Sequence, residues 1–63
     1  MLSITKLIEF KNKIARLQRR RRYFEELREV NKDRSKHVET SANEIIDECN
    51  QEIDRIKSLI EDN

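Results

Sequence analysis

The chain has 63 residues and a net charge of only +1, yet 43% of its residues are charged and it has no Gly and no Pro. So short a chain forms one domain at most and needs a disulfide, a metal or a partner chain for stability. Cys49 is the only cysteine, which excludes an internal disulfide, and Cys49 and His37 alone make no metal site. We therefore expect no cofactor, and we expect a homodimer.

Charge is distributed unevenly along the chain. Residues 1–34 carry eleven Lys/Arg against five Asp/Glu, a net +6, whereas residues 35–63 carry three against eight, a net −5. So much charge can indicate disorder, but the apolar residues are regularly spaced. The absence of helix breakers, with abundant Lys, Arg, Glu, Leu and Ile, indicates long helices, one basic and one acidic.

The first predicted element is a helix over about 3–32. Its apolar residues recur at spacings of three, four, three and seven, which is a helical pattern of the coiled-coil type. Arg21 occupies the gap in the stripe. The stripe residues are Leu7, Phe10, Ile14, Leu17 and Phe24.

A polar stretch follows, predicting a turn over about 33–40. Ser41 and Glu44 have the spacing of a capping box, which predicts a second helix over about 41–61. Asp33 and Ser35 are competing N-caps, and they predict an earlier start for that helix, near residue 36.

The second helix has an apolar stripe of the same kind. Glu52 occupies its gap, and Ile46, Ile53 and Ile60 widen it. The stripe residues are Ala42, Ile45, Cys49, Ile56 and Leu59.

Together these elements predict an all-α fold: a single-domain, coiled-coil-like antiparallel hairpin over residues 1–63 that dimerises into a four-helix bundle. The alternative is one continuous helix of about 90 Å in a coiled coil. In the hairpin, we expect Arg21 to face Glu52 in an ion pair that sets the register. Leu17 would face Ile56, Phe24 would face Cys49, and Ile14 would face Leu59. The predicted core and oligomer interface comprises Leu7, Phe10, Ile14, Leu17, Phe24, Ile45, Cys49, Ile53, Ile56 and Ile60.

The arginine run from Arg19 to Arg22 divides into two parts. Arg21 and Arg22 each have a glutamate four residues on, which predicts structural ion pairs with Glu25 and Glu26. Arg16, Arg19 and Arg20 have no such partner, and with Lys13 they form a basic strip that could bind phosphates. Tyr23, one turn from Arg19, could stack on a base. The candidate nucleic-acid-binding residues are Lys13, Arg16, Arg19, Arg20 and Tyr23.

The opposing interpretation is protein contact. Asp47, Glu48 and Asp54 on the second helix could meet the basic strip of a neighbouring chain, so that charge selects partner and orientation. We favour this reading. No catalytic signature is present, Cys49 lies on an apolar stripe as a small core residue, and two helices alone do not build a water-excluding pocket, so we do not expect an enzyme.

The sequence also bears on location. No segment resembles a secretion signal or is apolar enough to span a bilayer, and one unpaired cysteine fits a reducing compartment, so we expect a soluble cytoplasmic protein. Residues 2–17 have the pattern of an interfacial membrane helix, but anionic lipid would repel the acidic half. A membrane-surface role therefore ranks third.

A very short chain with two antiparallel helices resembles the Rop-type RNA-binding helical hairpins, which dimerise as four-helix bundles. The resemblance is one of length and helical pattern, so it implies a fold and RNA binding but no site residues. Our first hypothesis is a small non-enzymatic regulator or adaptor, of the kind that phages and plasmids often encode, acting by protein–protein interaction and self-association. Nucleic-acid binding is the second.

Overall fold

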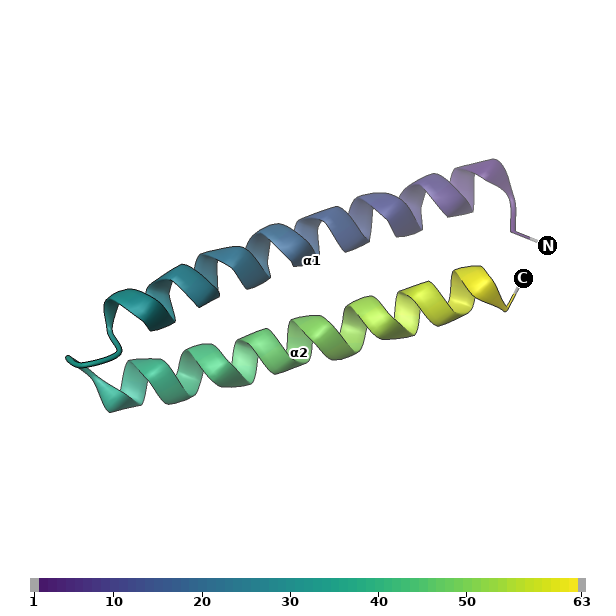
Figure 1. Cartoon of the computed structure of the whole chain (residues 1–63). Helices are drawn as coiled ribbons and strands as arrows, with labels where there is room; N and C mark the ends of the chain where they lie inside the picture. Colours follow the sequence, from purple (N-terminus) through teal and green to yellow (C-terminus); the bar gives the residue numbers. More distant parts are fainter. Residues whose placement is uncertain (1, 63) are drawn as a thin grey trace.

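The computed structural model describes residues 2–62 and contains two helices, α1 (Ile4–Val30) and α2 (Lys36–Glu61). The helices lie side by side and run in opposite directions, so that the start of α1 and the end of α2 lie at the same end of the molecule (Figure 1). The longest extent is 48 Å. The predicted all-α hairpin is confirmed, and the alternative of one continuous helix is wrong.

Serine residues start both helices. The Ser3 hydroxyl accepts a hydrogen bond from the Lys6 backbone N–H at 3.1 Å, and the Ser35 hydroxyl accepts one from the Val38 N–H at 3.3 Å. Each bond satisfies an N–H that has no partner within its helix. Because Ser35 provides the cap, α2 begins at Lys36, five residues before the preferred start at 41, and runs through the predicted capping box at Ser41.

Asn31 ends α1 without the help of a glycine. Its backbone N–H and its side-chain amide both donate to the Leu27 carbonyl, at 3.1 and 2.9 Å. These bonds satisfy a carbonyl that would otherwise lack a partner at the helix end. No described residue has a positive φ, so the turn from Asn31 to Ser35 uses conformations open to any residue.

The core is a narrow layer between the helices, and α2 supplies its buried residues. Their spacings of four, three, four and three keep them on one face of α2. Among the described residues of α1, by contrast, none is buried, and its apolar stripe is half-exposed. The buried residues are Ala42, Ile46, Cys49, Ile53 and Ile56.

The buried face of α2 is therefore rotated about the helix axis relative to the predicted apolar stripe. Ile46, which was expected only to widen the stripe, lies in the core at 7% exposure, beside the predicted core residue Ile53 at 3%. Leu59, expected opposite Ile14, is 46% exposed. Glu52 consequently lies at the margin of the helix pair and not in its centre.

Candidate binding surface

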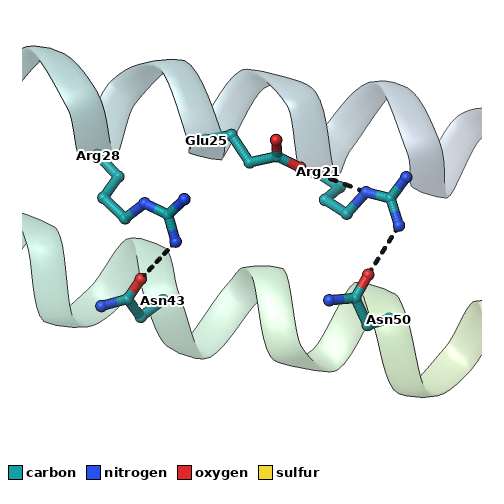
Figure 2. Close-up of polar contacts among 5 residues, drawn as sticks. All are labelled: Arg21, Glu25, Arg28, Asn43 and Asn50. Atoms are coloured by element: carbon teal, nitrogen blue, oxygen red, sulfur yellow. Dashed lines mark hydrogen bonds and ion pairs between the residues drawn. The ribbon is translucent and has the colours of Figure 1, made fainter.

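The expected ion pair between Arg21 and Glu52 is replaced by other contacts. Arg21 Nη1 donates to Asn50 Oδ1 at 2.7 Å, and Arg21 Nε lies 3.3 Å from Glu25 Oε1 (Figure 2). Glu52 instead lies 3.5 Å from Lys13 Nζ and 3.5 Å from Arg55 Nη1. Positions 50 and 52 are about 200° apart around the helix axis, so Arg21 cannot meet both margins of α2.

A second arginine repeats the cross-helix contact one heptad later. Arg28 Nη1 donates to Asn43 Oδ1 at 2.9 Å, and Figure 2 shows both arginines reaching from α1 to asparagines on α2. Arg28 follows Arg21 by seven residues, as Asn50 follows Asn43, so the two contacts lie in line along the hairpin. We call these four residues the asparagine edge. Sequence reasoning missed it, although the two matching seven-residue spacings are a signal that could have revealed it.

The asparagine edge also gives the register of the hairpin. Arg21 pairs with residue 50 where residue 52 was expected, a shift of two residues. Arg28 with Asn43 has the same offset. The polar pairs are therefore offset by two residues from the predicted register, in which Phe24 faces Cys49.

Of the two structural ion pairs predicted along α1, one is present. Arg21 with Glu25 is present at 3.3 Å, whereas Arg22 and Glu26 form no ion pair among the contacts of residues 2–62. Both members of the second pair are exposed, where such pairs contribute little.

The basic strip is only partly free. Lys13 is held near Glu52, and the Arg20 guanidinium lies over the Phe24 ring at 5.8 Å. Arg16 and Arg19 are exposed and make no hydrogen bond, ion pair or cation–π contact within the described part of the chain. These two side chains are therefore the available cations of the strip.

Tyr23 lies beside the strip and is 60% exposed. Its ring packs edge-on against Phe24, with centroids 5.1 Å apart and planes at 89°. The Phe24 contact covers one part of the ring and leaves most of the side chain exposed.

The acidic candidates lie on the opposite helix. Asp47, Glu48 and Asp54 are exposed, and none of them forms an ion pair among the described residues. Across residues 2–62, a single ion pair, Lys13 with Glu52, joins α1 to α2. The basic run is thus not matched internally by the acidic half of the chain.

The predicted core residues have different environments. Cys49, Ile53 and Ile56 are buried, and Cys49 is 3% exposed with its thiol free. The others are half-buried: Leu7, Phe10, Ile14, Leu17, Phe24, Ile45 and Ile60. Among the described residues, no three or more His, Cys, Asp or Glu side chains are grouped so that they could hold a metal ion.

No described helix is both long enough and apolar enough to cross a membrane. Comparison with known proteins gives no match to a family model, to a curated protein or to a solved structure. The charges and contacts of the hairpin itself therefore remain the guide to its function.

Proposed function

We propose that this protein is a small non-enzymatic regulator or adaptor that acts by binding other proteins and by self-association. One observation carries the proposal: the basic and acidic blocks of the chain lie side by side, yet one ion pair joins the two helices within residues 2–62. Most of the charge on each helix consequently remains available to another molecule.

The chemistry of the outer surface supports this function. Arg16 and Arg19 on α1, and Asp47, Glu48 and Asp54 on α2, are exposed. Charges arranged in blocks of opposite sign select partners and fix their orientation more than they add affinity. Such a surface suits an adaptor that docks in one orientation.

Two features support a role without catalysis. An open hollow beside the turn is lined by polar side chains from both helices and the turn, whereas ligand and active sites are mostly apolar and enclosed. The lining residues are Arg28, Glu29, Lys32, Glu39 and Asn43. The single thiol, Cys49, is buried in the apolar core, which also fits the proposed reducing cytoplasmic setting.

The test compares charge variants in quantitative affinity capture. One variant carries Arg16→Ala and Arg19→Ala, and another carries Asp47→Asn, Glu48→Gln and Asp54→Asn. We expect one of them to lose a specific protein partner, with binding at least tenfold weaker when measured by titration against the purified partner.

A matched control carries Lys11→Ala and Arg22→Ala. It removes two exposed cations from elsewhere on α1, and we expect it to keep the partner. A partner that is lost equally from the control and the charge variants would indicate nonspecific charge attraction and contradict the proposal.

Nucleic-acid binding is the second candidate, and the free state of Arg16 and Arg19 favours it. Neighbouring Tyr23 offers an exposed ring for base stacking. A few phosphate contacts give binding that weakens steeply with salt. The logarithm of the binding constant falls against the logarithm of the salt concentration with a slope of roughly −0.7 to −0.9 per neutralised phosphate.

This candidate is tested with generic RNA and duplex DNA at two salt concentrations. Binding through the strip would be lost in the Arg16→Ala/Arg19→Ala variant and kept in the Lys11→Ala/Arg22→Ala control. Absence of binding by the unaltered chain at low salt would remove the candidate.

A further inference from the structure

The hairpin exposes more surface than a folded chain of its mass should. Its accessible area is 5191 Å², whereas folded monomers of 7.7 kDa average about 4,300 Å². The excess is about 900 Å², close to the roughly 800 Å² per partner that a standard protein interface buries. The excess area is therefore of the size that one further partner covers.

The two long margins of the hairpin differ in chemistry. Along the asparagine edge, arginine–asparagine hydrogen bonds connect α1 to α2. The opposite margin, which we call the glutamate edge, carries the Lys13–Glu52 ion pair and the helix residues seven or fourteen positions before or after its two members. Its residues are Lys6, Lys13, Arg20 and Leu27 on α1, and Val38, Ile45, Glu52 and Leu59 on α2.

The glutamate edge is the more apolar margin. Leu59 is 46% exposed, and Leu27 and Ile45 are half-buried. Beside it, a cationic side chain lies over each of the rings of Phe10 and Phe24: Lys6 Nζ lies 5.4 Å from the first centroid and the Arg20 guanidinium carbon 5.8 Å from the second. Long cationic side chains can swing aside and leave the rings to a partner.

Charge identifies the occupant. Helix α1 carries nine Lys/Arg against four Asp/Glu, a net +5, and α2 carries three against seven, a net −4. Two copies packed with α1 of one against α2 of the other juxtapose opposite charges, whereas α1 against α1 would juxtapose like charges. A second copy of this chain thus offers both the apolar area and the complementary charge.

We infer that a second copy packs on the glutamate edge, with each α1 against the partner's α2, and completes a four-helix bundle. This inference rests on the self-association in the proposed function and assigns it a surface. The asparagine edge then remains on the outside of the dimer. High salt should weaken the dimer, because it screens the charges that orient the helices.

The experiment measures mass by light scattering over a range of concentrations, using the full chain. The unaltered chain should show twice 7.7 kDa. Leu59→Glu places a charge on the glutamate edge and should weaken the dimer at least tenfold. Ile8→Glu is the matched control: Ile8 is 53% exposed and lies about 140° around α1 from Lys13.

Leu59→Ala accompanies these variants in case the glutamate prevents folding, since it removes contact area without adding charge. Circular dichroism checks the helix content of each variant. We expect Leu59→Ala to weaken the dimer severalfold while Ile8→Glu leaves it intact.

The possible failures are distinguishable. A monomer at every concentration overturns both the assigned surface and self-association, and indicates an unlike protein as the occupant. A dimer that both glutamate variants disrupt equally, or that only Ile8→Glu disrupts, leaves self-association in place but overturns the glutamate edge as its surface. The charge-variant capture experiment tests partner binding independently of either result.

Discussion

Helices α1 and α2 have nearly the same length, 27 and 26 residues, but they contribute to the core very differently. Five residues of α2 are buried, and no described residue of α1 is. The buried α2 stripe is an unbroken line of Ile with the small residues Ala42 and Cys49, whereas the α1 stripe includes two Phe rings and is half-exposed. Arg21 and Arg28 interrupt the α1 stripe, so α1 covers α2 while remaining partly uncovered.

This comparison shows that a helical apolar repeat predicts which face turns inward but not how deeply it is buried. Depth depends on what lies opposite. One helix can fully cover a narrow stripe that includes small side chains, whereas a stripe with bulky aromatic rings needs a second neighbour. The two helices differ in charge as well, since α1, the partly covered helix, is also the basic one.

The sharpest test of this difference deletes apolar side chains from each helix. Ile53→Ala in α2, where the residue is 3% exposed, should lower the free energy of unfolding by about 2–4 kcal/mol. Ile4→Ala in α1, at 79% exposure, should change it by less than about 0.5 kcal/mol. Urea unfolding at one fixed chain concentration measures both, and equal costs would contradict the asymmetry.

The polar contact between the helices should show the next largest effect. Arg21→Ala leaves the part-buried Asn50 amide without its donor and should cost about 1–2 kcal/mol. Arg28→Ala, at an exposed contact, should cost less.

A double-mutant cycle on Arg21 and Asn50 should give a coupling of about 1 kcal/mol, and the corresponding cycle on Arg21 and Glu52 should give almost none. The reverse ranking would restore the register predicted from the apolar stripes.

The start of α2 can be tested by removing serine hydroxyls. Ser35→Ala should lower stability by about 0.5–2 kcal/mol, because the Val38 N–H loses its acceptor. Ser41→Ala, inside the helix, should be neutral or slightly stabilising, since alanine is the better helix former. Thermal unfolding followed by circular dichroism measures both, and a larger loss at Ser41 would place the helix start there.

The smallest expected effect is at the end of α2. Glu61 lies in the last turn, which has no basic residue, so its charge faces the negative end of the helix dipole. Glu61→Lys should raise stability by about 0.3–1 kcal/mol at low salt, and Glu61→Gln should give about half of that gain. Loss of stability in both variants would show that Glu61 has a favourable contact.

Local rules in the sequence were enough to determine the two helices. The absence of Gly and Pro, the apolar repeats and the capping serines are properties of neighbouring residues, and each acts through the nearby backbone. The start of α2 shows the limit of such reasoning. Ser35 and Ser41 both satisfy the local requirement, and only the folded chain shows that Ser35 is used.

Tertiary packing decided which residues meet across the hairpin. The stripes alone placed Arg21 opposite Glu52, but a rotation of α2 that buries Ile46 and Ile53 moves Glu52 to the other margin and brings Asn50 to Arg21. Consecutive residues are about 100° apart around a helix axis. A small change in which side chains pack best therefore changes every polar partner. Apolar periodicity is therefore readable in the sequence, whereas register and edge chemistry arise from the fit between two specific faces.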